Sequence, residues 1–159
     1  MPLTNQCRLI YASTASEKFM SNDALRGLVQ QCAENNRRAK IAGLLLLAGD
    51  QFLQVLEGPS KAVNALFRKI CVDKRHRDLD LLSFESIGPA YFDNWSMRLV
   101  DLYDLPMGSR QIFMRKYQHE NGVIHIPARL HEVYSLLLDA KAMCQSTLWD
   151  EPVAAPPGS

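Results

Sequence analysis

One amide side chain lies where a strand would be expected to carry an apolar residue. In "QFLQVLEG", residues 51–58, alternating faces put Gln54 on the same side as Phe52 and Leu56. A buried amide without partners costs about 1–3 kcal/mol per unsatisfied group, so a polar group must meet it. Glutamine carries a donor and an acceptor on one rotor, so a flip inverts a hydrogen-bond pattern without changing any charge. The candidate partners are Tyr11, Asn36 and a polar ligand.

The sequence contains no motif typical of catalysis. "GPSKAV", residues 58–63, lacks the glycines and the GK[ST] ending of a phosphate-binding loop. There is no GxSxG, HExxH or paired-carboxylate motif. The sequence therefore predicts a protein that is not an enzyme. Metal-ligand spacing is also absent, so we expect no metal site and interpret the four scattered cysteines as buried thiols: Cys7, Cys32, Cys71 and Cys144.

Length and charge limit the class of protein. A chain of 159 residues with 47% hydrophobic side chains is long enough for one domain with a real core. Its 18 basic against 17 acidic side chains give a net charge of +1, so no global field favours a nucleic acid or a membrane surface. The N-terminus lacks the features of a signal peptide, and "IAGLLLLAG" is too short to cross a bilayer. A cytoplasmic location is expected.

Periodicity predicts five strands and two helices. Residues 6–13 and two segments within 40–58 are expected to be strands, the latter two joined by a turn at Gly49 and Asp50. Strands are also expected at 79–88 and 95–102. Between them lie two helices, one capped by Ser21 and fading around 34–38, the other capped by Ser60. Their apolar stripes are Leu25, Leu28, Val29 and Cys32 in the first, and Val63, Leu66, Phe67, Ile70 and Cys71 in the second.

The order β-α-β-β-α-β-β predicts a ferredoxin-like α+β sandwich, a mixed five-stranded sheet with two helices on one face. Two C-terminal helices are expected at 107–117 and 127–144, with Pro127 in the first turn of the second. An apolar stripe on that last helix must pack on the outer face of the sheet or on another subunit; its members are Leu130, Val133, Tyr134, Leu137 and Leu138.

Five short pieces in fixed order carry a resemblance to a known family. They are "RLIYAS", "NNRRAKIAG", "FLQVLEG", "DKRHRD" and "FDNWSM", between about Arg8 and Val100. Asn36 lies seven residues before Gly43, and Gln54 lies eleven after it. In these pieces and spacings the chain resembles the BLUF family, blue-light sensors that hold FAD between the two helices of a ferredoxin-like sandwich. One departure is Ala42, where the family usually has threonine.

The resemblance implies a role for each matching residue. Tyr11 corresponds to the photoactive tyrosine, Gln54 to the switching glutamine, and Asn36 to the asparagine that holds the carbonyl edge of the flavin. Trp95 and Met97 correspond to the pair on the last strand whose exchange near the flavin is debated. The remaining implied contacts of the flavin are Asn35, Lys69, Asp73, Arg75 and His76.

The resemblance also implies a mechanism. Blue light makes the bound flavin, FAD with FMN or riboflavin as alternatives, a strong oxidant, and Tyr11 gives up an electron and then a proton. Gln54 is left rotated or in its imidic-acid tautomer, a flavin carbonyl gains a hydrogen bond, and absorption shifts slightly to the red. No covalent bond forms, and the network relaxes in the dark.

We expect three segments: residues 1–105 as the FAD-binding photosensory domain, 106–147 as a helical cap and output segment, and 148–159 as a flexible tail. The cap resembles that of short BLUF proteins that form ring-like homo-oligomers. A homo-oligomer and a downstream protein partner are therefore expected, without nucleic acid or membrane.

Simpler interpretations stay open from the residues alone. Tyr11 could be a strand tyrosine with its hydroxyl at a rim, and Gln54 fits an edge position as well as a ligand-facing one. Lys69 and Asp73, four residues apart, could be a solvated helix pair, and His76 a surface residue. Trp95 and Met97 could be ordinary core residues, and Asn36 a helix C-terminal residue. The corresponding alternative functions are a light-independent ferredoxin-like interaction or nucleic-acid-binding module, and a small enzyme such as an acyl phosphate hydrolase.

Overall fold

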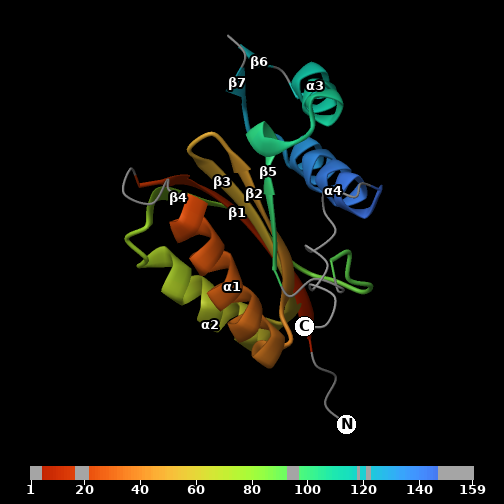
Figure 1. The fold of residues 1–159 in the computed structure, drawn as a ribbon. Coiled ribbons are helices and arrows are strands. Elements are labelled where there is room, and N and C mark those ends of the chain that lie inside the picture. The colour runs from red at the N-terminus through yellow and green to blue at the C-terminus, as the bar shows by residue number, and fades with distance from the viewer. Residues whose placement is uncertain (1–4, 17–21, 93–96, 118, 121–122, 147–159) are drawn as a thin grey trace, which may run out of the picture.

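A mixed sheet is covered by helices on both faces (Figure 1). The computed structural model describes residues 5–16, 22–92, 97–117, 119–120 and 123–146. The elements that form the first layer and the sheet are β1 (Gln6–Ala15), α1 (Asn22–Ala39), β2 (Ala42–Ala48), β3 (Gln51–Pro59), α2 (Ser60–Cys71), β4 (His76–Ser86) and β5 (Arg98–Asp101). They are followed by a 3-10 helix (Leu102–Asp104), α3 (Met107–Lys116), the short strands β6 (His119–Glu120) and β7 (Val123–Ile124), and α4 (Leu130–Ser146).

The strand order of the main sheet is β4-β1-β3-β2-β5. β1 is antiparallel to both β3 and β4, β2 is antiparallel to β3, and β5 is parallel to β2. The two crossovers place α1 and α2 on the same face (Figure 1). This topology confirms the ferredoxin-like sandwich with a mixed five-stranded sheet that the sequence predicts.

Glycine is required at two points of the β2–β3 hairpin. Gly49 turns the chain with φ of +66°, a left-handed conformation that residues with a Cβ avoid. At Gly43 a Cβ atom would lie 2.3 Å from the carbonyl oxygen of Val55 and 3.3 Å from Cε of Met97. Gly43 therefore lets Met97 pack close to the backbone of the hairpin.

The inner face of the sheet packs against α1 and α2. Val63 is fully buried there, and Leu66, Phe67 and Ile70 are half-buried against the same cluster. Cys71 is exposed, so its predicted place in the apolar stripe is wrong. The buried apolar side chains on this face include Cys7, Leu9, Tyr11, Leu45, Leu47, Phe52, Leu56 and, just before β5, Met97.

The outer face of the sheet is covered by α4 (Figure 1). The side chains of α4 that are 0% exposed are Val133, Leu136, Leu137 and Ala140. The helix therefore packs on the outer sheet face, one of the two expected locations. The predicted stripe is rotated, however, because Leu130 and Leu138 are 40% and 39% exposed.

Helix boundaries differ from the expectation at three places. The N-cap of α2 is Pro59, which makes no side-chain cap hydrogen bond, so Ser60 is the first helical residue rather than the cap. α4 begins at Leu130, so Pro127 precedes the helix instead of lying in its first turn. α2 ends at Cys71, so Asp73 is not helical. Ser21, the predicted cap of α1, lies outside the described residues.

Two further expectations concern the burial of the cysteines and the crossing of a membrane. All four cysteines are free; Cys7 and Cys144 are buried, Cys32 is half-buried and Cys71 is exposed, so the prediction of four buried thiols is wrong for the last. Within the described ranges, none of the helices has both the length and the apolar character that crossing a membrane requires.

Candidate functional site

Tyr11 and Gln54 meet on the inner face of the sheet. They lie directly opposite each other in the antiparallel register of β1 and β3. Such cross-strand neighbours have Cβ atoms about 4.5–5.5 Å apart, so their side chains can interact. The Tyr11 hydroxyl donates a hydrogen bond to Oε1 of Gln54, and both side chains are at most 5% exposed. This bond supplies the polar partner that a buried amide needs.

The other end of the Gln54 amide points toward Met97. Nε2 of Gln54 donates to Sδ of Met97 at 3.5 Å. A thioether is a weak acceptor, and among the described residues it is the acceptor that this amide nitrogen finds. Gln54 also lines the cavity that lies beside the sheet.

A cavity lies between α1, α2 and the inner face of the sheet. Its volume is about 190 Å³, whereas one water molecule needs roughly 10–15 Å³ of such space. Apolar side chains form most of its walls, and amide, basic and acidic groups interrupt them. The apolar lining residues are Leu28, Val29, Leu45, Phe52, Leu66 and Ile70.

Helix α1 contributes two neighbouring asparagines to this cavity. Asn36, in the last turn, is 2% exposed, and its backbone carbonyl accepts a hydrogen bond from the Ile41 amide at 2.8 Å. Asn35 also lines the cavity but is largely exposed. Gln31 and Cys32, one turn earlier, line the same cavity.

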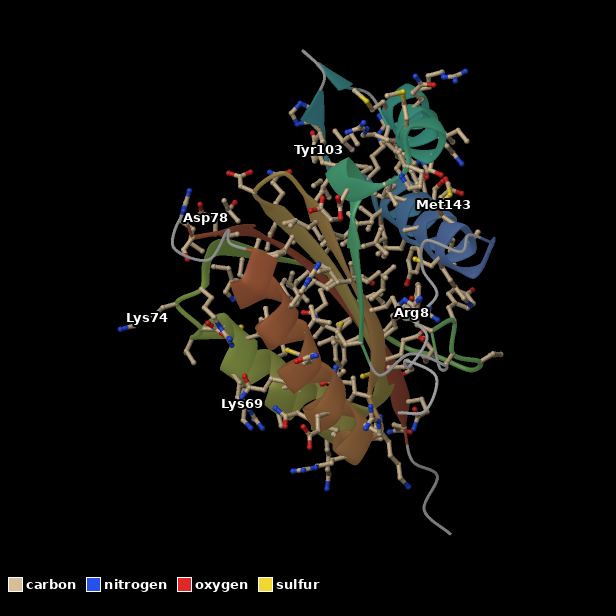
Figure 2. All side chains as sticks on the ribbon, viewed as in Figure 1. Arg8, Lys69, Lys74, Asp78, Tyr103 and Met143 are labelled. Atoms are coloured by element: carbon tan, nitrogen blue, oxygen red, sulfur yellow. The ribbon has the colours of Figure 1, made fainter. Side chains whose placement is uncertain are left out.

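The end of α2 places an ion pair at the cavity. Nε of Arg75 donates to Oδ1 of Asp73 at 2.9 Å, and the Arg75 backbone amide donates to the same oxygen. These bonds, above all the side-chain bond from Arg75, hold the pKa of Asp73 below its usual value. The partner of Asp73 is thus Arg75. The interpretation of Lys69 and Asp73 as a pair on one face of α2 is wrong, because α2 ends at Cys71, before Asp73. Lys69 lines the cavity and is exposed on the α1–α2 side of the sheet (Figure 2).

His76 ties β4 to the end of α2 and to β1. Nε2 lies 2.7 Å from the carbonyl oxygen of Ile70, and Nδ1 lies 2.7 Å from Oγ of Ser13. Because a carbonyl only accepts, Nε2 carries a proton. The ring is half-buried and meets Tyr11 edge-on with centroids 6.1 Å apart, so it is not a surface residue.

Electrostatics keep the Tyr11 phenol neutral. Burial raises the pKa of Tyr11 far above its ordinary value, and the nearby Cys32 and Asp73 act in the same direction. A neutral phenol is a hydrogen-bond donor, as the bond to Gln54 requires.

All predicted site residues that the structure describes line this one cavity, and Trp95 lies outside the described residues. The members brought together are Tyr11, Asn35, Asn36, Gln54, Lys69, Asp73, Arg75, His76 and Met97. Sequence reasoning missed lining residues that simple spacing could have found. Cys32 lies four residues before Asn36, Phe52 lies two before Gln54, and Leu45 is opposite Gln54 in the β2–β3 register.

Comparison with known families decides the affiliation. The sequence profile of the family described as "Sensors of blue-light using FAD", BLUF, matches residues 7–98, which is more than half of the chain. The chain belongs to the BLUF family. BLUF proteins are light sensors, so the fold and the cavity belong to a sensory domain.

Individual BLUF relatives agree with this affiliation. The blue light- and temperature-regulated antirepressor BluF of Escherichia coli (strain K12) is 33% identical over 47% of this chain, but that match spans 19% of its own length. The alpha subunit of photoactivated adenylate cyclase of Euglena gracilis is 39% identical over 45% of this chain and 7% of its own. The solved ground state of BlsA is 29% identical with a TM-score of 0.71, covering 85% of this chain and 87% of that one.

The cavity suits the cofactor of a BLUF protein. A flavin has an aromatic ring system with carbonyl oxygens and nitrogens along its edge. The apolar walls match such a ring, and the amides of Gln54 and Asn36 offer donors and acceptors for its edge. Among the described residues, Nε2 of Gln54 has only the weak thioether acceptor of Met97, so a stronger acceptor on a ligand in this cavity would suit it.

Proposed function

We propose that this chain is a blue-light receptor in which Tyr11 and Gln54 form the light-sensitive pair. The observation that carries the proposal is the hydrogen bond from the buried Tyr11 hydroxyl to an amide that borders the cavity. The opposite end of that amide has only a sulfur as acceptor among the described residues, which supports a ligand on that side.

Each part of the cavity has a role in holding the flavin. Asn36 and Gln54 bind its polar edge, and the apolar side chains of α1, α2 and the sheet enclose its ring. Asn35, Lys69, Arg75 and His76 surround the remainder. FAD is the flavin we propose, with FMN or riboflavin as alternatives.

The chemistry proceeds through the protein's own hydrogen bonds. A bound flavin supplies blue-light absorption and, once excited, a strong oxidant. Tyr11 releases one electron to it, and its hydroxyl proton moves along the existing bond to the Gln54 amide. After the electron returns, Gln54 gives one proton back to Tyr11, which is again a neutral phenol. If that proton leaves the amide oxygen, Gln54 stays as a rotated amide; if it leaves the amide nitrogen, Gln54 stays as the imidic-acid tautomer. Its donor and acceptor ends have then changed places relative to Tyr11 and Met97.

The light-induced change must reach another molecule. We assign residues 1–105 to the photosensory domain and 106–147 to a helical cap that carries the output; the tail expected at 148–159 lies outside the described residues. The family match to residues 7–98 and the packing of α4 on the outer face support this division. We further propose a cytoplasmic homo-oligomer that acts on a downstream protein.

Absorption spectroscopy of the purified protein tests this function. We expect a yellow protein whose visible spectrum shifts slightly to the red under blue light and returns in the dark. Tyr11→Phe should retain the colour and lose the shift, because the electron and proton donor is gone.

Tyr103→Phe is the matched control, since its hydroxyl binds the Ile124 amide far from the cavity. A full shift in Tyr11→Phe would contradict the role of Tyr11. A colourless protein from flavin-supplied cells would instead favour a light-independent interaction or nucleic-acid-binding module.

A further inference from the structure

Two charged side chains are buried on the opposite face of the sheet from the cavity. Arg8 and Glu57 are 4% and 1% exposed and lie directly opposite each other in the β1–β3 register. Nε of Arg8 donates to Oε2 of Glu57 at 2.7 Å, and Nη2 lies 2.6 Å from the same oxygen without hydrogen-bond geometry. Figure 2 places Arg8 on the α4 side of the sheet. Burying two ions is unfavourable unless further hydrogen bonds compensate, so the other contacts of this pair matter.

Glu57 holds the backbone that follows β4. Its carboxylate accepts hydrogen bonds from the backbone amide of Tyr91 at 2.9 and 3.0 Å and from that of Phe92 at 2.6 Å. The Arg8 guanidinium lies 4.0 Å from the centre of the Tyr91 ring, and Phe92 is 1% exposed. The segment at residues 91–92 is thereby fixed to β1 and β3.

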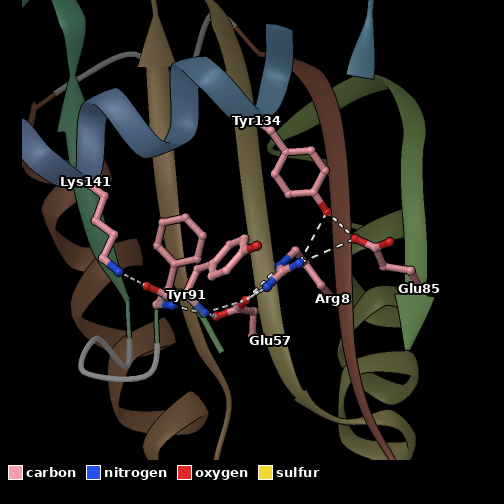
Figure 3. A network of polar contacts seen from close by, with 7 residues as sticks. Arg8, Glu57, Glu85, Tyr91, Tyr134 and Lys141 are labelled. Carbon is pink, nitrogen blue, oxygen red and sulfur yellow. Dashed lines mark hydrogen bonds and ion pairs between the residues drawn. The ribbon is translucent and has the colours of Figure 1, made fainter. Parts of the chain in front are cut away.

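The same cluster is joined to α4 from two positions (Figure 3). The Tyr134 hydroxyl donates to Oε1 of Glu85 and lies 3.5 Å from Nη1 of Arg8. About two helical turns after Tyr134, Nζ of Lys141 donates to the backbone carbonyl of Tyr91. α4 therefore contacts both the ion pair and the segment that Glu57 holds.

This network adjoins the photosensitive site through two covalent connections. Glu57 lies three residues after Gln54 on β3, with its side chain on the other face. Arg8 likewise lies three residues before Tyr11 on β1. A displacement of the Tyr11–Gln54 pair therefore acts on the two strands that carry Arg8 and Glu57.

We infer that the network of Arg8, Glu57, Glu85, Tyr91, Phe92, Tyr134 and Lys141 couples the Gln54–Met97 contact to the position of α4. In the dark it holds α4 on the sheet. When Gln54 exchanges its donor and acceptor ends, its contact with Met97 is lost, β1 and β3 shift at Arg8 and Glu57, and Lys141 and Tyr134 release α4. This inference rests on the proposed function and adds the route of its output.

Hydrogen exchange of the backbone amides in residues 130–146 tests the coupling, measured in the dark and under blue light together with the absorption spectrum. Light should speed this exchange in the unmodified protein by about fivefold or more, the low end of typical coupling between sites. Lys141→Met and Tyr134→Phe should keep the absorption shift and lose this light–dark difference. Lys116→Met and Tyr117→Phe are matched controls, because their side chains bind α4 at Asp139 without touching the network. Both controls should keep the difference.

The outcomes separate this inference from the proposed function. A light–dark difference that persists in both network variants would overturn the coupling, as would an unmodified protein that shifts its absorption without any change in α4. A protein without an absorption shift would refute the proposed function and the coupling with it. Glu57→Gln is a less suitable variant, because it leaves the Arg8 charge buried without its counter-ion.

Discussion

At the scale of single residues, the decisive feature is a neutral side chain between a phenol and a thioether. Gln54 accepts from Tyr11 at one end and donates to Met97 at the other. A half turn of the amide would place its NH2 group at Tyr11 and its oxygen at the Met97 sulfur, which has no proton to donate. The orientation with the amide oxygen toward Tyr11 is therefore favoured. A carboxylate in this position would bring a charge into the interior at high cost, and leucine would have no polarity to invert.

Gln54→Leu removes both ends of the amide. We expect flavin to remain bound, the red shift to be absent, and the free energy of unfolding to fall by about 1–3 kcal/mol, because the buried Tyr11 hydroxyl loses its acceptor. Absorption spectroscopy and urea unfolding measure the two effects. Gln51→Leu, at the start of the same strand, should keep the shift, and a normal shift in Gln54→Leu would refute the role of the amide.

How far the sequence predicts the site depends on the kind of signal. Gln54 stands out because period-two alternation makes a polar residue visible inside an apolar strand. The placement of Asp73 was not predictable in this way, because α2 ends at Cys71 with Val72 as its C-cap, without a glycine or proline to mark the end. Arg8 and Glu57 could have been found from the pairing of Tyr11 with Gln54, because an antiparallel register that aligns 11 with 54 also aligns 8 with 57.

At the scale of elements, α4 shows the limit of helical periodicity. The sequence offers several overlapping apolar stripes on this helix, and counting leucines does not decide which one faces the sheet. The sheet selects Val133, Leu136 and Leu137, since its outer face presents a matching apolar surface. The sequence thus predicts that the helix forms, whereas tertiary packing decides which of its faces is buried on the sheet.

Leu136→Ala tests this rotation. We expect it to lower the free energy of unfolding by about 2–5 kcal/mol, as for other leucines removed from a packed core. Leu138→Ala, the same change two residues later on an exposed side, should alter it by only about 0.5 kcal/mol. Urea unfolding followed by circular dichroism gives both values. Equal effects would mean that α4 does not pack as described.

At the scale of the whole molecule, the two faces of the sheet have different tasks. The inner face and its two helices enclose the cavity, and the outer face seats α4 (Figure 1). Large apolar side chains remain exposed on α3 and α4, among them Met107 at 66% and Ile112 at 54%. Apolar groups exposed in this way are typical of surfaces that bind another protein. We therefore predict that the expected homo-oligomer forms through the side of the molecule opposite the cavity.

Light scattering after size-exclusion chromatography checks the assembly. We expect the unmodified protein to form an oligomer, and the double change Met107→Ser and Ile112→Ser to shift it toward the monomer, because it removes apolar contact area. Val72→Ser is the control, since Val72 is 78% exposed but follows α2 on the cavity side. A monomeric unmodified protein would contradict the prediction.

The alignment of β1 with β3 also makes cofactor uptake a measure of correct folding. Because side chains alternate, sliding β1 by a single residue would turn Tyr11 toward α4 and Arg8 toward the cavity side, and sliding β3 would do the same to Gln54 and Glu57. A misaligned chain would then lack both the polar edge for the ring and the anchor for the last helix. The yellow colour regained during refolding should therefore count the molecules whose strands have paired in the native frame.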